Sequence, residues 1–421
     1  MTYYRFPDTK LYKAAFFLFL LALQMLSRTS MVSAVFLGFH RAQFLAIGLI
    51  AAAGIVFLFA NRKNLKQVLT DSRMVVVLGI VALMALGMLV KWDFQMLYFS
   101  ILMYLLFAVF LTFFVTTQEA ATCYVLLFAF LGAYTLVGMF VLKPLVQAGI
   151  LPGNEFLSLG GWHMYNFGLT YTVYLNNELN PALRAFGIFR EPGLYQIFLF
   201  IAIQLNNYTV QWKKQWQMWA VNGILFVTLM ATFATGGVFA LVLYVVFLFF
   251  DKKYYKNKKL RLLAVLCVVA AVASVFFAFW LEGTWAYELI GMVDKVLSRT
   301  SSYTDRINSI FFNARTFLQH PLFGHRISDV IYSVDNNTAT SAILFASFGI
   351  VGGCLHVLSW VALAWRKDRS ILMNLILLVI LFIPFNTQNV IHDMFFWLFP
   401  VMALVEKGVP VLKTIKFKRT A

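Results

Sequence analysis

Two arginines and a glutamate lie immediately before an apolar segment of this chain. The run Arg184-Ala185-Phe186-Gly187-Ile188-Phe189-Arg190-Glu191-Pro192-Gly193 closes a polar stretch and opens an apolar one. Charges beside hydrocarbon are costly, so the few that an apolar chain retains tend to mark functional sites. Arginine neutralises negative charge through a planar, permanently charged fork, and a carboxylate can accept a proton from a hydroxyl. The run therefore predicts a site that holds an anionic group.

The composition is that of a membrane protein. Hydrophobic residues make up 62% of the chain and charged residues 12%, and the mean hydropathy is +0.80. A soluble domain carries about a quarter charged residues. The net charge of +17 follows the expected membrane topology, so we do not expect a nucleic-acid partner. Cys123, Cys267 and Cys354 all lie in apolar runs and lack the spacing of metal ligands.

Apolar spans recur along the whole chain. About 20 residues cross the hydrocarbon of a bilayer, and most of the spans reach that length. Arg28 interrupts the first span, which predicts a short helix followed by an interfacial turn. We expect this span to stay as an anchor, because it has no small-residue cleavage site. The spans lie at 14–38, 43–60, 73–91, 95–116, 120–142, 194–208, 217–234, 236–250, 260–281, 339–364, 370–388 and 394–405.

The basic residues orient these spans. With the N-terminus inside, most Lys and Arg residues fall in the short inner loops, as the positive-inside rule requires. The opposite orientation would place the basic cluster of residues 252–261 outside. The sequence thus predicts an all-α polytopic membrane protein with about 12 transmembrane helices and both termini inside.

Two connections are long, and both fall on the extracytoplasmic side. Long loops of compact proteins are usually functional or disordered, and the aromatic content of these two argues against disorder. They divide the chain into N-terminal transmembrane helices at 1–142, a first extracytoplasmic loop at 143–193, central transmembrane helices at 194–281, a second extracytoplasmic loop at 282–338, and C-terminal transmembrane helices with a basic cytoplasmic tail at 339–421.

The second loop contains an amphipathic helix over residues 304–319. Arg306 lies on one edge of its apolar stripe, with Ser309 and Asn313 nearby on the helical wheel, and Arg315 lies on the other edge. This favours Arg306 over Arg315 as part of a site. Pro321 ends the helix. The apolar residues at helical spacing are Ile307, Ile310, Phe311, Ala314, Phe317 and Leu318.

The opening run resembles the "R-x-x-G-x-F-x-E-P-G" signature of bacterial O-antigen, capsule and exopolysaccharide polymerases (Wzy-type proteins), which are relatives of the O-antigen ligases. Further stretches between residues 180 and 355 are similar to the same family in order and spacing. Each of these motifs is short. They are Thr232-Phe233-Ala234-Thr235-Gly236-Gly237, Arg306 on an outer-loop helix, Pro321-Leu322-Phe323-Gly324, and Phe348-Gly349-Ile350-Val351-Gly352.

The resemblance implies a GT-C-like glycosyltransferase of the bacterial plasma (inner) membrane, with its active site on the extracytoplasmic side. Its substrate would be an oligosaccharide linked to undecaprenyl diphosphate, and the membrane lipid would surround it. We expect Arg190 and Arg306 to bind the diphosphate and Arg184 to support them. Glu191 would position or deprotonate the acceptor hydroxyl, with Asp335 as the rival base.

Several further residues are candidates for binding the diphosphate or the glycan. Trp162 and His163 could contact sugar, although packing within the loop explains them equally. Glu191 could also simply pair with a neighbouring arginine at a helix N-terminus. We expect no metal and no cofactor, because neither an Asp-x-Asp motif nor a nucleotide-binding glycine loop is present. The remaining candidates are Arg315, Arg326, His325 and Asn336, and His392-Asp393 caps the outer end of the last span.

Two alternatives stay open. The ligase branch of the family carries a His-Asn pair where the second loop re-enters the membrane, but this chain reads Val334-Asp335-Asn336-Asn337-Thr338 there. The second alternative is a flippase or transporter, for which the sequence shows neither two related halves nor charges at the membrane midplane. A polymerase would work with a flippase and a chain-length regulator of the same pathway as possible partners.

Overall fold

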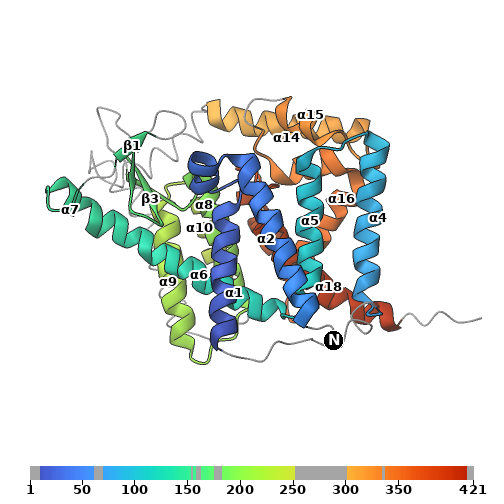
Figure 1. Ribbon diagram of the computed structural model, residues 1–421, viewed down its shortest axis with the longest axis horizontal. Helices are drawn as coiled ribbons and strands as arrows, with labels where there is room; N and C mark the ends of the chain where they lie inside the picture. The colour runs from blue at the N-terminus through green and yellow to red at the C-terminus, as the bar shows by residue number, and fades with distance from the viewer. Residues whose placement is uncertain are drawn as a thin grey trace, which may run out of the picture.

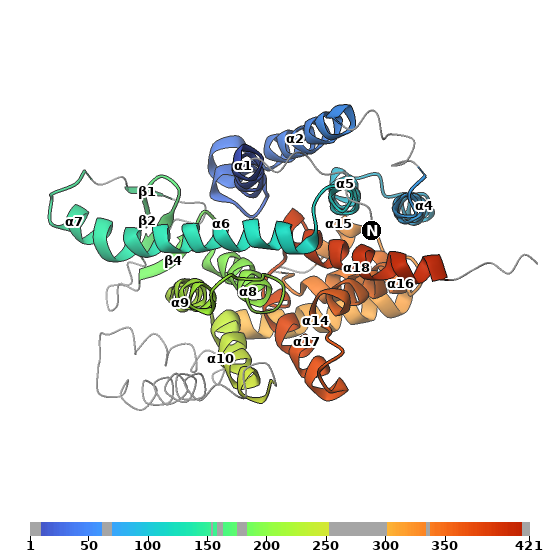
Figure 2. The ribbon, with the colours of Figure 1, turned by 90° about the horizontal axis from the view of Figure 1, so that it is seen from below.

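The computed structural model describes residues 10–60, 70–152, 155–157, 163–174, 183–251, 301–333 and 337–414. Most described residues are helical, and most helices run side by side through the thickness of the molecule (Figures 1 and 2). One helix, α14 (Ser301–Gln319), lies across one end of the others. We call this the α14 end of the molecule.

Helices occupy every predicted span that falls within the described residues, whereas the span at 260–281 lies outside them. Four helices are long and apolar enough to cross a membrane by length and composition. The chain is therefore a mainly helical, membrane-embedded protein. The N-terminal helices are α1 (Lys10–Leu26), η1 (Val32–Leu37), α2 (Phe39–Ala60), α4 (Arg73–Lys91), α5 (Met96–Leu111), α6 (Thr117–Val137), η3 (Gly138–Leu142) and α7 (Lys143–Gln147).

The first predicted span divides as its charge predicted. α1 ends at Leu26, a turn of residues 27–31 contains Arg28, and α2 then returns through the molecule. The later helices are α8 (Pro192–Tyr208), α9 (Gln215–Ala231), α10 (Thr235–Phe250), α15 (Ile327–Tyr332), α16 (Thr340–Ala364), α17 (Ile371–Phe385) and α18 (Met394–Thr414).

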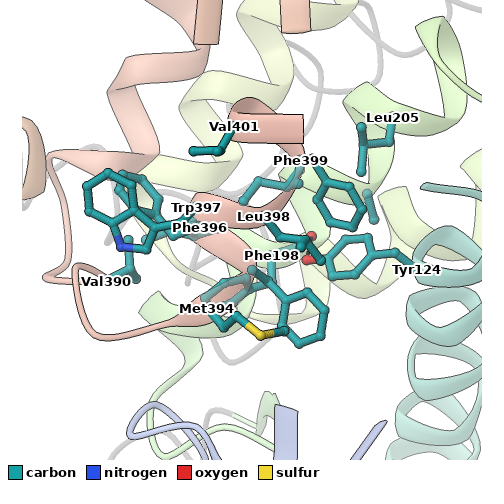
Figure 3. Close-up of a cluster of buried hydrophobic side chains, with 14 of the residues drawn as sticks. Tyr124, Phe198, Leu205, Val390, Met394, Phe396, Trp397, Leu398, Phe399 and Val401 are labelled. Atoms are coloured by element: carbon teal, nitrogen blue, oxygen red, sulfur yellow. Dashed lines mark hydrogen bonds between the residues drawn. The ribbon is translucent and has the colours of Figure 1, made fainter. Parts of the chain in front are cut away.

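Helix α8 is the centre of the core. It is packed against α6, α9, α10 and α17 (Figure 2), and its side chains from Leu194 to Leu205 are almost completely buried. An aromatic cluster beside it joins α6 to α18, where the ring of Tyr124 lies 4.8 Å from that of Phe399 and 5.1 Å from that of Phe395 (Figure 3). Such pairs each contribute roughly 0.5–1.5 kcal/mol beyond the area they bury.

The first predicted loop contains a sheet that the sequence analysis did not anticipate. Its four antiparallel strands are in the order β1-β2-β3-β4. The strands are β1 (Glu155–Leu157), β2 (His163–Asn166), β3 (Tyr171–Tyr174) and β4 (Leu183–Gly187). Gly187 ends the last strand with φ +56, where a Cβ would overlap the Tyr195 ring of α8. Residues 188–191 therefore connect the end of the sheet directly to the start of α8.

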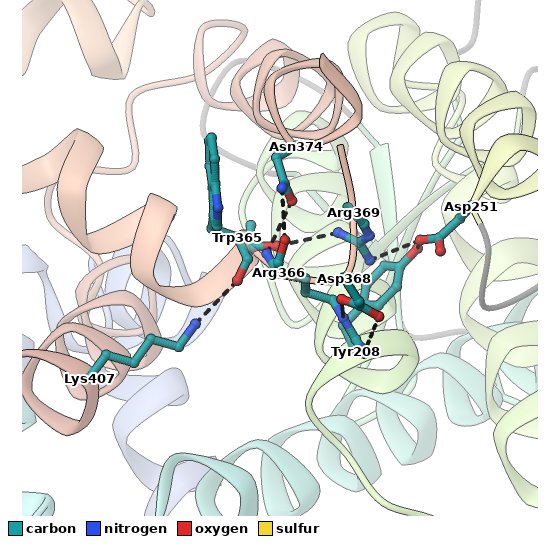
Figure 4. Close-up of polar contacts among 9 residues, drawn as sticks. Tyr208, Asp251, Trp365, Arg366, Asp368, Arg369, Asn374 and Lys407 are labelled. Atoms are coloured by element: carbon teal, nitrogen blue, oxygen red, sulfur yellow. Dashed lines mark hydrogen bonds and ion pairs between the residues drawn. The ribbon is translucent and has the colours of Figure 1, made fainter. Parts of the chain in front are cut away.

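A buried ion pair fastens the opposite end of the molecule (Figure 4). Arg369, between α16 and α17, lies 2.9 Å from Asp251 at the end of α10, and both side chains are 3% exposed. Tyr208 at the end of α8 donates a hydrogen bond to the same carboxylate, and its ring lies 4.1 Å from the Arg369 guanidinium. Three segments far apart in sequence are joined here.

Replacing Arg369 with alanine is expected to destabilise the protein by about 3–5 kcal/mol, because it removes the guanidinium that lies 2.9 Å from the buried Asp251 carboxylate. The matched control is Arg366→Ala, which removes an ion pair with Asp368 in which the side chains are 35% and 62% exposed and should cost less than about 1 kcal/mol. Thermal unfolding of both variants in the same detergent measures the difference. Equal losses would contradict a fastening role for Arg369.

Candidate anion-binding site

The turn between α1 and α2 pairs with the segment that precedes α8. The amide of Met31 donates to the carbonyl of Ile188 at 2.9 Å, and the amide of Arg190 donates to the carbonyl of Thr29 at 3.0 Å. An isolated antiparallel bridge joins Ser30 and Phe189 between these two bonds. Two stretches of chain some 160 positions apart are thereby held in a fixed register at the α14 end.

This pairing brings two arginines to one aromatic ring. The guanidinium carbons of Arg28 and Arg190 lie 5.1 Å and 5.6 Å from the centre of the Phe39 ring. Such cation–ring contacts are each worth roughly 0.5–2 kcal/mol. Arg28 also reaches the hydroxyl of Tyr332 on α15 at 3.5 Å. Glu191 lies 3.9 Å from the Nε of Arg190, with 39% of its side chain exposed.

The turn that contains Arg28 is hydrogen-bonded to the buried carboxylate of Asp393. The Oδ2 atom of Asp393 accepts hydrogen bonds from Ser27 at 2.5 Å and Thr29 at 2.6 Å, and from Gln24 at 3.1 Å. Its Oδ1 atom accepts the amide of Phe395 at 2.8 Å and so caps the N-terminus of α18. Asp393 is fully buried, and its recorded donors are all neutral groups.

The neighbouring His392 is a neutral imidazole. Burial lowers its pKa well below the usual value, and the charges of Arg28 and Arg190 lower it further. Its Nδ1 atom has no hydrogen-bond partner among the described residues. Burial also lowers the pKa of Arg190; Glu191 partly offsets this effect and Arg28 adds to it. Arg190 nevertheless stays charged, since arginine is not deprotonated in proteins.

Helix N-termini converge behind these side chains. Two helices form hydrogen bonds to the connection of residues 386–393. The Nε2 atom of Gln196 in α8 donates to Thr387 at 3.1 Å. The hydroxyl of Thr340 in α16 donates to the Gln388 carbonyl at 2.6 Å. Glycines permit the approach, because a Cβ at Gly193 or Gly236 would overlap Gln388 or Thr387. The positive ends of α8, α10, α16 and α18 therefore face one region.

Arg184 has a different environment from Arg190. Its Nε donates to the carbonyl of Thr232 at 3.1 Å and its Nη2 to the carbonyl of Phe233 at 2.8 Å. These carbonyls follow the last residue of α9, so the guanidinium satisfies groups that a helix end leaves without partners. The structure thus joins two of the family-like motifs through Arg184.

Arg306 lies on the half-buried face of α14. Burial lowers its pKa and Asp305 opposes the shift. Ser309 and Asn313 share that face, and both donate to the Oδ1 atom of Asn337, at 2.5 Å and 2.8 Å. The predicted apolar stripe points away from the protein, with Phe311 63% exposed and Leu318 73% exposed. The periodicity of the helix was predicted correctly, but its polar face is the one that packs.

Two further motifs meet where α16 is broken. Gly349 has φ +64, and the amide of Ile350 donates to the carbonyl of Pro321 at 2.7 Å. The amide of His325 donates to the carbonyl of Ala346, also at 2.7 Å. The loop before α15 thus satisfies backbone groups that the break exposes, which a membrane-embedded helix requires.

The other predicted site residues are spread more widely. His325 lies 3.5 Å from Asp329, Arg326 donates to the carbonyl of Lys91 at 3.1 Å, and Arg315 is exposed on α14. Asp335, Asn336 and Trp162 lie outside the described residues, as does the side chain of His163 in β2. Sequence reasoning noted Arg28 only as the charge that interrupts a span, and that interruption was the signal that could have marked it as a site residue.

Comparisons of the chain with models of known protein families, with curated proteins and with solved structures found no match. Among the described residues, no three His, Cys, Asp or Glu side chains form a group that could hold a metal ion.

Replacing Gly349 with alanine is expected to destabilise the protein and to detach the loop before α15. The backbone conformation of Gly349 (φ 64, ψ −161) is essentially confined to glycine and costs another residue about 1–3 kcal/mol, and the new Cβ would overlap the Leu322 carbonyl. Gly223→Ala in α9 is the control, because its Cβ would meet open space and alanine favours a helix. Thermal unfolding and proteolysis of the loop measure the effect; a Gly349→Ala variant as stable as Gly223→Ala would contradict it.

Proposed function

We propose that this protein is a polysaccharide polymerase of the Wzy type. It would transfer a glycan chain from undecaprenyl diphosphate to a sugar hydroxyl of another lipid-linked repeat unit, at the outer face of the bacterial plasma membrane. The α14 end would be the extracytoplasmic end of a GT-C-like protein with about 12 transmembrane helices. The family resemblance of residues 180–355 supports this proposal, and the arrangement around Arg190 fits it.

The observation that carries the proposal is the placement of Arg190. The side chain is 35% exposed, it lies just before the N-terminus of α8, and its Nε atom, which is itself buried, has no hydrogen-bond partner among the described residues. An arginine fork with unused donors can bind phosphate oxygens bidentately. The adjoining Glu191 is accessible to a second substrate. An anion holder and a proton acceptor thus stand side by side at the mouth of α8.

The proposed reaction needs few groups. The acceptor oxygen attacks the anomeric carbon of the donor sugar, a carbon–oxygen bond forms, and the bond from that carbon to the diphosphate breaks. The bonding electrons leave with undecaprenyl diphosphate, whose developing charge Arg190 and Arg306 would stabilise, at about 3 kcal/mol for each well-placed donor. The acceptor proton passes to Glu191, and Asp335 remains the rival base.

The two other activities give different products. A ligase would move finished polymer to a lipid or protein acceptor, and a flippase would carry the lipid-linked unit across the membrane unchanged. A flippase needs a charged path through the protein interior. Among the described residues, Arg28 and Arg190 lie at the α14 end, while the buried Arg369 at the opposite end is paired with Asp251. This distribution favours a transferase.

Arg190→Ala and Arg306→Ala are each expected to abolish chain extension at unchanged protein level. The assay is the glycan profile of a polymerase-deficient host that carries the cognate repeat-unit pathway: the unaltered protein gives a ladder, and the variants give a single lipid-linked repeat. Arg190→Lys should also fail, since lysine keeps the charge but loses the fork. Lys213→Ala, an exposed residue at the opposite end, is the control and should give a full ladder.

The outcomes separate the candidate activities. A full ladder from both alanine variants would contradict the site assignment. Polymer that forms on the carrier without this protein, but fails to reach its final acceptor, would indicate a ligase. Loss of all lipid-linked repeat from the outer face would indicate a flippase.

A further inference from the structure

We propose that Arg28, from the turn between α1 and α2, is the second arginine of the anion site and that Asp393 is the residue that positions it. Arg28 would bind one phosphate of the diphosphate while Arg190 binds the other. This inference rests on the proposed function for the identity of the ligand. It adds to that function a binding residue outside every family-like motif and a positioning residue at the start of the last helix.

The first argument is the unbalanced charge. Arg28 and Arg190 approach the same Phe39 ring, and like charges repel each other, so an anion between them would be favoured. Within the described part of the chain Arg28 has no ion-pair partner, and its recorded hydrogen bond is a long one to Tyr332. Glu191, at 3.9 Å from Arg190, balances at most one of the two charges. A diphosphate supplies the missing negative charge.

The second argument is the set of hydrogen bonds that the Asp393 carboxylate accepts. Its carboxylate accepts hydrogen bonds from the side chains of Gln24, Ser27 and Thr29. Ser27 and Thr29 immediately flank Arg28 in sequence. The carboxylate thus fixes the backbone on both sides of Arg28 and leaves the guanidinium free for a ligand.

The third argument is the shared backbone register. Thr29, which Asp393 holds through its hydroxyl, also accepts the amide of Arg190 through its carbonyl. One residue therefore links the position of Arg28 to the position of Arg190. Asp393 acts through this turn and does not itself need to touch the substrate. Any loosening of the turn should weaken phosphate binding by both Arg28 and Arg190.

Binding of a soluble prenyl diphosphate to the purified full-length protein tests the proposal. The probe is farnesyl diphosphate, with farnesol as its uncharged counterpart, and the readout is the dissociation constant in one detergent. Arg28→Ala should weaken farnesyl diphosphate binding about 10- to 100-fold, as expected for hydrogen bonds to a charged group, and should leave farnesol binding unchanged. Arg28→Lys should recover part of the affinity. Lys213→Ala is again the matched control.

Asp393→Asn separates positioning from simple stability. It should weaken farnesyl diphosphate binding at least as much as Arg28→Ala, and the loss in the double variant should be smaller than the sum of the two single losses, because both changes remove the Arg28 contact. If Asp393→Asn does not yield folded protein, Ser27→Ala and Thr29→Val each remove one donor to the carboxylate and should produce a smaller loss in the same direction.

Three results would overturn the inference. Unchanged affinity in Arg28→Ala, with loss in Arg190→Ala, would refute the role of Arg28 and leave the proposed function standing. Additive losses in the double variant would refute positioning by Asp393. Absence of farnesyl diphosphate binding by the unaltered protein would overturn both this inference and the diphosphate chemistry of the proposed function.

Discussion

The hydrogen-bond cluster around Asp393 is the constraint from which the rest of the site follows. A buried carboxylate is unfavourable by several kcal/mol unless donors compensate it, and here one side chain of α1, two side chains of the turn that follows it and one amide of α18 do so. The start of the chain is thereby tied to its last helix. Because the same turn pairs with residues 188–190, the cluster also determines where the mouth of α8 lies.

Close packing of helix ends makes the second contribution. Gly193, Gly236 and Gly237 stand where a Cβ would overlap Gln388, Thr387 or Gln196, so the N-termini of α8 and α10 can meet the connection before α18. Backbone dipoles at these ends favour negative charge by roughly 0.3–1 kcal/mol each when exposed. The arginines supply most of the attraction for an anion, and the helix ends add to it without further titratable groups.

The sequence predicted the helices because apolar periodicity is a local property, and it predicted the break at Arg28 because a charge cannot remain in a continuous apolar span. It did not predict the sheet of the first loop, since β1 to β4 are short and depend on pairing between strands. The sequence also did not predict which face of α14 packs against the protein. That face depends on residues distant in sequence, such as Asn337, that lie next to the helix in the fold. Arg190 and Glu191 were predicted as site residues from their position before an apolar span, whereas the contact of Arg28 with the Phe39 ring depends on the turn and its pairing with residues 188–190.

Arg184 and Arg190 show why residue type alone does not identify a binding group. They lie six positions apart in one motif, yet Arg184 uses its Nε and one N–H of its Nη2 on two backbone carbonyls at the end of α9, which leaves fewer of its five donors for a ligand. Arg190 keeps an unused donor. Removing Arg184 would expose unsatisfied carbonyls and loosen the turn between α9 and α10, and its effect on activity would then arise through stability. The capacity to bind an anion belongs to the arginines whose donors the fold leaves unoccupied.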